Sequence, residues 1–272
     1  MPAADRPRTV LLTGAAGGMG TLMRDLLPAH GYALRPHDIR PVAGAPDAFV
    51  SDLADLGAVR EAVRGVDAIV HLGGISVEAP FEEILRANIQ GAYHLYEAAR
   101  LEGIRRVVFA SSNHAVGFTP RPVGDAPLIP VDTPHRPDTL YGLSKSFGED
   151  LAQFYWDRHG VETVSIRIGS CIPEPTSVRM LSVWLSPADG ARLLHAALIA
   201  EDVGHTVVYG SSANTRLWWD LAPARALGYA PRDDSEPYAA KLIAAEGELS
   251  PDNPDHAHLG GHFCTNPPVW PH

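Results

Sequence analysis

Residues 9–20, TVLLTGAAGGMG, join a short apolar run to a cluster of glycines near the start of the chain. The run from Thr9 to Thr13 is apolar and β-branched and stops at Gly14, as a buried parallel strand does. Behind the glycines, apolar residues recur at helical spacing, namely Met19, Leu22, Met23, Leu26 and Leu27. Glycines between a strand and a helix permit a tight turn and let backbone N–H groups approach a pyrophosphate. This context favours a dinucleotide-binding turn over a purely structural one.

Residues 139–150, TLYGLSKSFGED, carry a second pattern. Tyr141 and Lys145 are four residues apart, so on a helix both side chains lie on one face. A free phenol loses its proton near pH ~10, and a nearby cation lowers that pKa. The pair can therefore form a general base that removes a hydroxyl proton, although the same spacing also occurs by chance on surface helices. The glycine turn and a serine-rich strand end between the two motifs favour the catalytic interpretation.

Other strand and helix patterns extend this framework along the chain. We expect further strands at Ala33–Asp38, Phe49–Leu53, Ala68–Gly74, Val107–Ser112, Glu162–Ile168 and Thr206–Tyr209, and helices at Phe81–Leu101, Tyr141–His159, Ser186–Ala200 and Pro237–Glu246. The predicted fold class is α/β, a Rossmann-type doubly wound parallel sheet of about seven strands with a small C-terminal substrate-binding portion. Residues 1–168 are expected to form the dinucleotide-binding core with the catalytic helix. Residues 169–272 are expected to add substrate-binding segments and an irregular tail, 247–272, within a single compact unit.

Composition narrows the class of protein. The 272 residues are 45% hydrophobic, enough for a substantial core. The formal net charge of −10 and the lack of a Lys/Arg cluster argue against a nucleic-acid or membrane-surface partner. Cys171 and Cys264 are the only cysteines, and the start of the chain lacks the apolar core of a signal peptide. No apolar run reaches the roughly 20 residues needed to cross a bilayer, so a cytoplasmic location is expected.

Acidic residues near two predicted strand ends bear on the choice of cofactor. Asp38 lies 18 residues after Gly20, where a carboxylate binds ribose hydroxyls and repels a 2′-phosphate. This spacing favours NAD over NADP, although Arg40 could either pair with a phosphate or be a solvated loop charge. Asp52, with Leu53, is placed to meet the adenine, but Asp52 could equally cap the helix that starts near Asp55.

Polar side chains gather at the C-terminal ends of the predicted strands, where ligands bind in such sheets. Ser76 follows the fourth strand, and the fifth ends in Ser111, Ser112, Asn113 and His114. Ser170 and Cys171 follow the sixth, and Arg179 is a candidate for a substrate carboxylate, or else a surface arginine. His71 is expected to be a packed histidine. Asn88 could be a satisfied core group or an organiser of water and backbone near the site.

Two irregular stretches complete the sequence. Residues 117–140 contain six prolines and run directly into Tyr141, and a loop of this length is a candidate cover for the substrate. The tail carries His256, His258 and His262, but no cysteine or carboxylate stands at ligand spacing from them. We therefore expect no metal site.

Taken together, the three motifs resemble the extended short-chain dehydrogenase/reductase family along most of the chain. The segments HLGGISVE (71–78), FASSNHAVGF (109–118), YGLSKSFGE (141–149) and RIGSCIPEP (167–175), followed by residues 179–182 (RMLS), further resemble the uronate dehydrogenases of that family. The similarity extends to residues 260–263 in the tail. The connection before Tyr141 is longer than expected for that group and the tail differs in composition, which affects the expected substrate range more than the chemistry.

The resemblance implies roles for individual residues. Tyr141 would be the base, Lys145 would lower its pKa and hold the nicotinamide ribose, and Ser112 would bind the reacting oxygen. The implied cofactor site comprises Gly14, Gly17, Gly18, Met19, Gly20, Asp38, Asp52, Leu53, Leu72, Gly73, Gly74, Ile168 and Cys171, with Tyr141 and Lys145. The implied sugar site comprises Ser76, Ser112, Asn113, His114 and Ser170 for hydroxyls, Arg179 for the C6 carboxylate and Phe263 for the apolar side.

The resemblance also implies an activity, namely NAD-dependent oxidation of the C1 hydroxyl of D-glucuronate or D-galacturonate to the aldarolactone. It further implies a homo-oligomer, for which Phe81–Leu101 and Tyr141–His159 are the candidate contact helices. One alternative is a nucleotide-sugar epimerase or dehydratase with a retained cofactor, but such enzymes usually carry a larger C-terminal domain. Another is a non-catalytic NAD-binding protein on the same fold, which typically lacks the Tyr and Lys pair.

Overall fold

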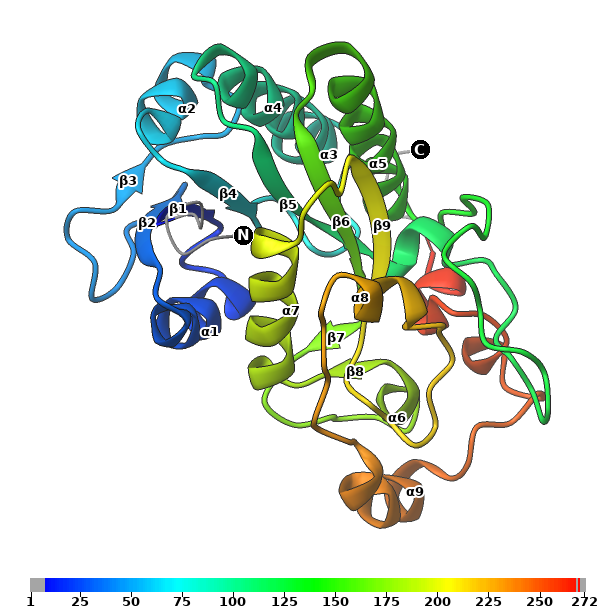
Figure 1. Cartoon of the computed structure of the whole chain (residues 1–272). Coiled ribbons are helices and arrows are strands. Elements are labelled where there is room, and N and C mark those ends of the chain that lie inside the picture. Colours follow the sequence, from blue (N-terminus) through cyan, green and yellow to red (C-terminus); the bar gives the residue numbers. More distant parts are fainter. Residues whose placement is uncertain (1–7, 268, 270–272) are drawn as a thin grey trace.

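The computed structural model describes residues 8–267 and residue 269 (Figure 1). Within these residues seven strands form one sheet in the order β3-β2-β1-β4-β5-β6-β9, and every neighbouring pair is parallel. Their bounds are β1 (Thr9–Thr13), β2 (Ala33–Asp38), β3 (Phe49–Val50), β4 (Ala68–His71), β5 (Arg106–Ser112), β6 (Glu162–Ile168) and β9 (His205–Gly210). The strand order reverses between β1 and β4, which confirms the predicted doubly wound fold.

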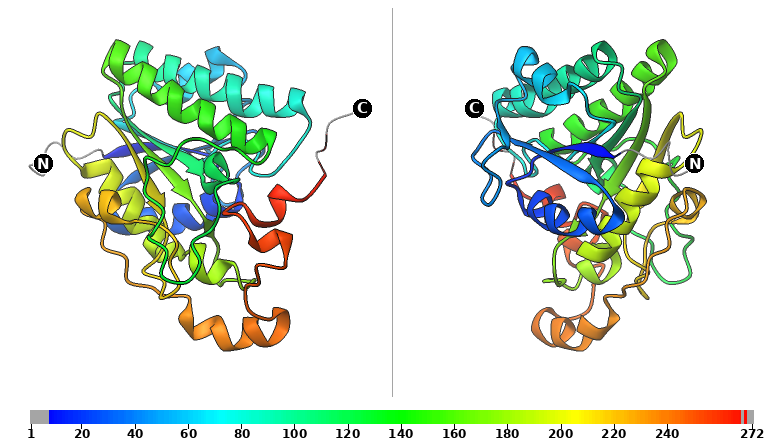
Figure 2. Two further views of the ribbon diagram at one scale, coloured as in Figure 1. Left: turned by 90° about the vertical axis from the view of Figure 1, so that its right-hand side faces the viewer. Right: turned by 60° about the vertical axis from the view of Figure 1, so that its left-hand side comes forward.

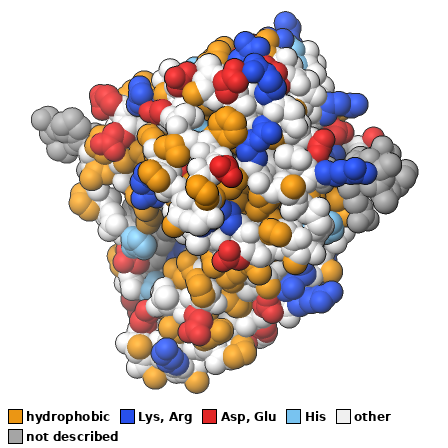
Figure 3. Space-filling view, turned by 90° about the vertical axis from the view of Figure 1, so that its left-hand side faces the viewer, with side chains coloured by type: hydrophobic (Ala, Val, Ile, Leu, Met, Phe, Trp, Pro, Cys, Tyr) orange, Lys and Arg blue, Asp and Glu red, His pale blue; other side chains and the backbone are white. Residues whose placement is uncertain are grey.

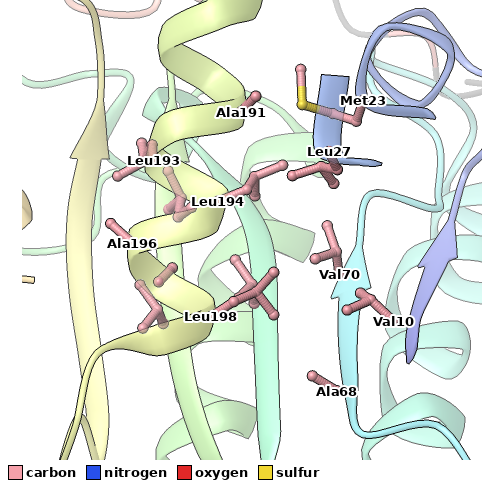
Figure 4. Close-up of a cluster of buried hydrophobic side chains, with 14 of the residues drawn as sticks. Val10, Met23, Leu27, Ala68, Val70, Ala191, Leu193, Leu194, Ala196 and Leu198 are labelled. Atoms are coloured by element: carbon pink, nitrogen blue, oxygen red, sulfur yellow. The ribbon is translucent and has the colours of Figure 1, made fainter. Parts of the chain in front are cut away.

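Helices cover both faces of this sheet (Figures 1 and 2). One face carries α1 (Gly18–Leu26) and α7 (Pro187–Ile199), and the other carries α2 (Leu56–Val63), α4 (Gly91–Leu101) and α5 (Leu140–His159). Side chains alternate along β1, so Val10 and Leu12 join the first core whereas Leu11 joins the second. Figure 4 shows part of the first core, in which Leu194 and Leu198 of α7 lie on the side that faces Leu27, Val70 and Val10.

The segment after β4 differs from its prediction as one regular helix. It consists of α3 (Phe81–Ile84), a π-helical segment η2 (Leu85–Gln90) and then α4. Asn88 lies in the π-helical segment and is buried there. A π-turn adds one residue to a helix, so side chains there depart from the regular α-helical repeat. Such turns are common at functional sites.

Strand and helix ends also differ from the sequence prediction. The third strand ends at Val50 instead of Leu53, because the Asp52 side chain accepts a hydrogen bond from the Ala54 N–H (2.8 Å) and starts a turn. The fourth ends at His71 instead of Gly74, which has a φ of +129°. The predicted helix 237–246 is a 3₁₀ turn, η4 (Glu236–Tyr238), followed by α9 (Ala239–Glu246). The helix predicted at 186–200 is confirmed, with the Ser186 hydroxyl accepting from the Asp189 N–H (2.9 Å).

The buried face of α5 contains small and polar residues more than large apolar ones. Tyr141, Lys145, Ala152 and Tyr155 are buried, whereas Phe154 is 51% exposed. The apolar pattern of residues 141–159 predicts Phe154 on the buried face, and this prediction is wrong. Close packing is the reason, since a Cβ at Gly148 would lie 2.2 Å from the Phe109 ring of β5.

The C-terminal portion packs beneath the sheet edge at which β6 and β9 end. It contains short elements that the sequence did not indicate, namely α6 (Met180–Val183), α8 (Ala222–Ala226) and a two-stranded parallel sheet of β7 (Ser170–Cys171) and β8 (Trp184–Leu185). The tail is largely irregular, as predicted, with two 3₁₀ turns, η5 (Pro254–His256) and η6 (Gly261–Cys264).

The proline-rich connection, residues 117–140, is irregular, as expected, but is fastened at several points. Pro120 forms a bridge with His258 of the tail, and Ile129 forms one with Trp219. Beneath them lies a core cluster made of Val116, Val183, Tyr209, Trp218, Trp219, Leu221 and Leu259. In Figure 2 (left) the connection and the tail lie on the same side of the molecule. The connection is therefore packed against the tail and this core cluster.

Surface and helix properties complete the description. On the face shown in Figure 3, acidic and basic side chains are interspersed with apolar ones and do not form a large patch of one sign. Among the helices in the described part of the chain, none has the length and hydropathy required to cross a membrane.

Candidate active site

A cleft of about 470 Å³ lies at the C-terminal ends of β1, β2 and β4. The predicted cofactor residues that line it are Gly14, Gly17, Gly18, Met19, Gly20, Asp38, Asp52, Leu53, Leu72, Gly73 and Gly74. Ser76, expected to contact the sugar, also lines this cleft. Ile168 and Cys171 pack instead against the core under α7, where the Cys171 Sγ would lie 3.3 Å from a Cβ at Gly190.

The glycine turn is shaped by close backbone packing. Gly14 has a φ of +70°, and a Cβ there would lie 2.8 Å from the backbone of Leu72 and Gly73. A Cβ at Gly20 would lie 2.0 Å from the Gly14 carbonyl oxygen, so α1 can start directly behind β1 only if this residue is glycine. A Cβ at Gly18 would meet no atom within 4 Å, which leaves open space at the start of α1. These features fit the diphosphate of a dinucleotide.

Asp38 is held at the end of β2 by two backbone donors. Its carboxylate accepts from the N–H groups of Ala16 (2.9 Å) and Arg40 (3.0 Å), and its side chain is almost buried. The carboxylate therefore ties β2 to the glycine turn at the end of the cleft where the ribose is expected. The Arg40 side chain is 68% exposed and its Nε lies 3.8 Å from this carboxylate, so it does not replace Asp38 there.

Asp52 does not cap the following helix. The N-cap of α2 is Asp55, whose Oδ1 accepts from the Ala58 N–H at 3.1 Å. Asp52 instead forms an ion pair with Arg86 (2.9 Å), and both residues line the cleft with Leu53. The capping alternative is wrong, and the charged pair closes the end of the cleft where adenine is expected.

Ser112, Tyr141 and Lys145 come together between the ends of β5 and α5, and all three are buried. Ser112 hydrogen-bonds to the Tyr141 hydroxyl. The Lys145 Nζ lies 5.6 Å from the centroid of the Tyr141 ring and donates to the Ala110 carbonyl at 2.8 Å. The three side chains thus form one contiguous polar group between β5 and α5.

The expected lowering of the Tyr141 pKa is not what this environment produces. Burial raises the pKa of Tyr141 to about 12, the Ser112 hydrogen bond opposes the rise, and the charge of Asp138 adds to it. Burial also lowers the pKa of Lys145 to about 8. The lysine charge is directed at the Ala110 carbonyl instead of the phenol oxygen, and desolvation of the phenolate dominates.

Hydrogen bonds at its first turn fix the start of α5. The Thr139 hydroxyl accepts from the Gly142 N–H (2.9 Å), and the Glu78 carboxylate accepts from the Tyr141 N–H (3.0 Å). A Cβ at Gly142 would lie 2.4 Å from the His114 carbonyl oxygen. Because α5 approaches the end of β5 so closely, the Tyr141 side chain lies next to Ser112.

Asn88 links the wall of the cofactor cleft to this helix. Its amide accepts from the Ile75 N–H (2.7 Å) and donates to the Ile75 carbonyl (2.9 Å) and to the Ser144 hydroxyl (2.9 Å). The Ser144 hydroxyl in turn donates to the Tyr141 carbonyl at 2.7 Å. Asn88 is therefore a satisfied buried group that also organises backbone next to the site.

The other predicted substrate residues meet at the tail. The Phe263 and His114 rings stack with centroids 4.1 Å apart, and the His114 ring is 5.7 Å from that of Tyr141. The Leu259 carbonyl accepts from Asn113 Nδ2 (3.3 Å) and from Arg179 Nε (3.0 Å). The tail thus packs against His114, Asn113 and Arg179 on one side of the Tyr141 group. Ser170 lies in β7, which pairs with β8.

Not every polar residue at the strand ends points into this site. Ser111 donates to Glu149 beneath the sheet edge (2.5 Å), because alternate residues of β5 face opposite sides. His71 hydrogen-bonds to the Thr13 hydroxyl (2.7 Å), and burial lowers its pKa to about 3, so the prediction of a packed histidine is confirmed. Among the described residues, no group of three or more His, Cys, Asp or Glu side chains could hold a metal ion.

Sequence reasoning missed two carboxylates. Asp138 lies beside His114, and Glu78 caps α5 at Tyr141. Asp138 immediately precedes the N-cap Thr139, which is the one local signal that could have singled it out. Neither carboxylate stands at a diagnostic spacing from its partner in the sequence.

Comparisons with known proteins agree with this geometry. The family described as the NAD dependent epimerase/dehydratase family matches residues 10–181. Uronate dehydrogenase of Pseudomonas syringae pv. tomato is 52% identical, over 95% of this chain and 94% of that protein. The crystal structure of a glucuronic acid dehydrogenase from Chromohalobacter salexigens superposes with a TM-score of 0.90 at 46% identity, covering 96% of this chain and 98% of that one.

A second solved structure, a mutant uronate dehydrogenase from Agrobacterium tumefaciens complexed with NAD, superposes with a TM-score of 0.90 at 44% identity, covering 97% of this chain and 99% of that one. The resemblance inferred from the sequence motifs is thus confirmed over nearly the whole chain. The glycine turn, the Tyr141 and Lys145 pair and these similarities lead to one conclusion: the chain belongs to the NAD dependent epimerase/dehydratase family.

Proposed function

We propose that this chain is an NAD-dependent uronate dehydrogenase, which oxidises the C1 hydroxyl of D-glucuronate or D-galacturonate to the aldarolactone and releases NADH. Its relatives with that name are similar over 95% or more of this chain. The cofactor cleft and the Ser112–Tyr141–Lys145 group support the oxidoreductase chemistry. Asp38 supports the choice of NAD, because a fixed carboxylate at the end of β2 repels a 2′-phosphate.

The observation that carries the substrate class is an arginine without an acidic partner beside the catalytic group. In the part of the chain described, no carboxylate lies within ion-pair distance of Arg179, and burial lowers its pKa to about 10. Two of its N–H groups donate to the Leu259 carbonyl. Its charge acts on His114, whose ring contacts Tyr141. The charge of Asp138 acts on Arg179 without a direct ion pair, so a substrate carboxylate would supply the direct partner.

Each residue of the site would have a separate role in the reaction. Tyr141 as phenolate would accept the proton of the C1 hydroxyl, while Ser112 hydrogen-bonds to the same oxygen. Arg179 would pair with the C6 carboxylate, and Phe263 would cover the apolar side of the sugar. NAD, when bound, accepts the hydride from C1 and brings a positive charge that favours the phenolate over the neutral phenol. An Arg–carboxylate pair contributes about 1.5–3 kcal/mol, which separates a uronate from a neutral hexose by roughly tens-fold.

A spectrophotometric assay tests this proposal. NADH formation is followed with NAD or NADP against D-glucuronate, D-galacturonate, D-glucose and D-galactose. We expect turnover with both uronates and NAD, a much lower kcat/KM with NADP, and little turnover of the neutral hexoses. Tyr141→Phe should lower kcat by at least about 10²-fold while NAD still binds, because only the proton acceptor is lost. Equal use of glucose and glucuronate would exclude the carboxylate pairing.

The same assay separates the two alternatives. A nucleotide-sugar epimerase or dehydratase with a retained cofactor would not release stoichiometric NADH. A non-catalytic NAD-binding protein would bind NAD and turn over none of the four sugars. An intact Tyr141 and Lys145 pair and a small C-terminal portion after Ile168 agree better with the dehydrogenase than with either alternative.

We further infer a homo-oligomer in the cytoplasm. Large apolar side chains stand exposed on the helices that the sequence marked for subunit contact, namely Tyr93 and Leu101 of α4 and Leu143 and Phe154 of α5. Both cysteines, Cys171 and Cys264, are free thiols, which agrees with a reducing compartment.

A further inference from the structure

One buried carboxylate has no part in the chemistry above. The Asp138 side chain is 0% exposed and lies between β5, α5 and the tail. It accepts from His114 Nδ1 (2.6 Å) and from the Thr139 hydroxyl (2.9 Å), and the Cys264 Sγ lies 3.8 Å away. Within the described residues no lysine or arginine forms an ion pair with it. Its hydrogen-bond donors are neutral, and the charge of Arg179 acts on it only from beyond ion-pair distance. A buried carboxylate held in this way is costly to retain, so its position calls for a functional reason.

Three separate segments leave space for this carboxylate. A Cβ at Gly117 would lie 2.0 Å from Asp138 Oδ2, one at Gly260 would lie 1.9 Å from the same oxygen, and one at Gly142 would lie 3.0 Å from Oδ1. The glycines belong to the connection, the tail and α5. Because any side chain at the first two positions would overlap the carboxylate, its position is determined by the fold.

The contact with Asp138 determines whether the second ring nitrogen of His114, Nε2, carries a proton. Burial lowers the pKa of His114 below its ordinary value, although the charge and hydrogen bond of Asp138 oppose this shift, and the lowered pKa favours the neutral imidazole. A neutral ring that donates from Nδ1 to Asp138 keeps an unprotonated Nε2, which can only accept a hydrogen bond. The stacked Phe263 ring prevents the imidazole from rotating freely. The imidazole, with one defined acceptor nitrogen, then lies with its centroid 5.7 Å from that of the Tyr141 ring.

We propose that Asp138 is a positioning residue that holds His114 in its Nδ1–H tautomer, so that Nε2 accepts a hydrogen bond from a substrate hydroxyl beside Tyr141. The identity of that hydroxyl rests on the proposed function, but the tautomer does not. Asp138 acts through His114 and does not itself touch the sugar. The pair therefore selects a hydroxyl donor at this place and disfavours a group that can only accept.

The charge of Asp138 also affects the pKa of Tyr141, the proposed base. It raises the pKa values of Tyr141, His114 and Arg179. The other charged or titratable groups that face this cluster are Lys145 on α5, Glu78 at the start of α5, and His262 and Cys264 on the tail. Removing the charge of Asp138 should therefore lower the pKa of Tyr141 and move the acidic limb of the kcat profile to lower pH.

A nuclear magnetic resonance experiment tests the tautomer on the unmodified enzyme. Long-range ¹H–¹⁵N spectra of the ¹⁵N-histidine-labelled protein distinguish the two neutral tautomers, and the His114→Gln variant assigns the signal. We expect His114 to carry its proton on Nδ1 at neutral pH. A proton on Nε2, or a charged imidazolium, would overturn the proposal. This readout is independent of turnover, so it still decides the point if the enzyme does not oxidise uronates.

Two variants test the role in catalysis. Asp138→Ala removes the acceptor and should lower kcat/KM for the uronate by about 10-fold or more, with His114 moving toward the Nε2–H tautomer. Asp138→Asn keeps the shape, removes the charge and should shift the acidic limb of the kcat profile downward. NAD affinity should stay within about twofold, because Asp138 does not line the cleft at the ends of β1, β2 and β4.

The matched control is Asp125→Asn, which removes one negative charge from an exposed position on the same connection. It should leave the pH profile and kcat/KM unchanged. If Asp138→Ala retained the kcat/KM of the original enzyme, or if both Asp138 variants lost NAD affinity in step with activity, Asp138 would have only a structural role and the proposal would fail.

Discussion

The carbonyl oxygen of Leu259 accepts hydrogen bonds from two side chains of the site, those of Asn113 and Arg179. The Leu259 side chain is fully buried in the cluster beneath the connection, so this acceptor is held by packing. Two residues later, Gly261 has a φ of +63°, and a Cβ there would lie 2.8 Å from the Arg179 Cδ. The orientation of Arg179 thus depends on the Leu259 carbonyl as acceptor and on the lack of a side chain at Gly261.

Arg179→Ala should weaken the preference for uronates, because it removes the cation that would pair with the C6 carboxylate, and Gly261→Ala should have the same effect. Both changes should lower kcat/KM for galacturonate by roughly tens-fold through KM, since the Arg–carboxylate pair is weakened, with NAD affinity unchanged. Steady-state kinetics and NAD titration measure this. Gly124→Ala is the control, because Gly124 has a similar φ of +59° with no atom within 4 Å of its added Cβ. If Gly261→Ala and Gly124→Ala behaved alike, backbone strain and not the arginine would explain the effect.

At the scale of elements, α5 is the part that joins the catalytic group to the rest of the fold. Tyr141, Lys145 and Glu149 follow each other at four-residue intervals, so they lie along one face of the helix. Glu149 accepts from Arg167 of β6 (2.8 Å) and Ser111 of β5 (2.5 Å), and contacts His135 of the connection (2.8 Å). One buried carboxylate therefore ties the catalytic helix to two strands and to the proline-rich connection.

This network predicts how stability depends on pH. Hydrogen bonds and the Arg167 charge hold the pKa of Glu149 at about 2 against an ordinary value of 4.5, despite burial, which acts in the other direction. A lowered carboxyl pKa contributes stability that is present above the unfolded value and is lost as pH falls toward the folded one. The free energy of unfolding, measured by urea titration, should accordingly fall between pH 4.5 and 2.

Glu149→Gln should lower the free energy of unfolding by about 3 kcal/mol or more at neutral pH, because Arg167 is left buried without its counter-charge. The variant should also show a weaker loss of stability in acid than the unmodified protein. Glu174→Gln, at an exposed position, serves as the control and should match the unmodified protein. Parallel pH curves for the two variants would contradict this account of Glu149.

On the scale of the whole molecule, the outer face of the α4 and α5 layer is the candidate subunit interface. Figure 2 (left) shows these helices side by side on the outside of the sheet. Leu143 and Phe154 are eleven residues apart, which is close to three helical turns, so both project from one stripe of α5. Exposed apolar side chains that continue onto α4 at Tyr93 and Leu101 are typical of a surface that is covered in an oligomer.

Sedimentation velocity tests the interface. The unmodified protein should sediment as a multiple of its 29.2 kDa chain mass. Phe154→Lys should shift the distribution to the monomer, because a lysine would be desolvated in the contact. Val123→Lys changes a similarly exposed apolar residue on the connection and should leave the assembly intact. A monomeric unmodified protein, or equal behaviour of the two variants, would remove α5 as the contact helix.

Local patterns in the sequence determined much of the fold and the centre of the site. Strand β6 is predicted to the residue, and the glycine turn, Asp38 and the Tyr141 and Lys145 pair each depend on contacts within a strand–turn–helix unit or within one helix. Period and spacing along the chain encode such contacts directly. The π-helical segment around Asn88 and the exposure of Phe154 follow from packing between elements, so the period alone placed them wrongly.

The tertiary structure alone decided how the substrate side is assembled. Asp138 meets His114 across 24 residues, and Leu259 meets Arg179 across 80 and Asn113 across 146. The pKa of Tyr141 likewise depends on burial by distant segments, which reverses the direction expected from its lysine neighbour. Sequence spacing determines which residues share a helix face or a strand end. Only the path of the chain through space determines which carbonyls and carboxylates surround these residues, and how completely the residues are shielded from water.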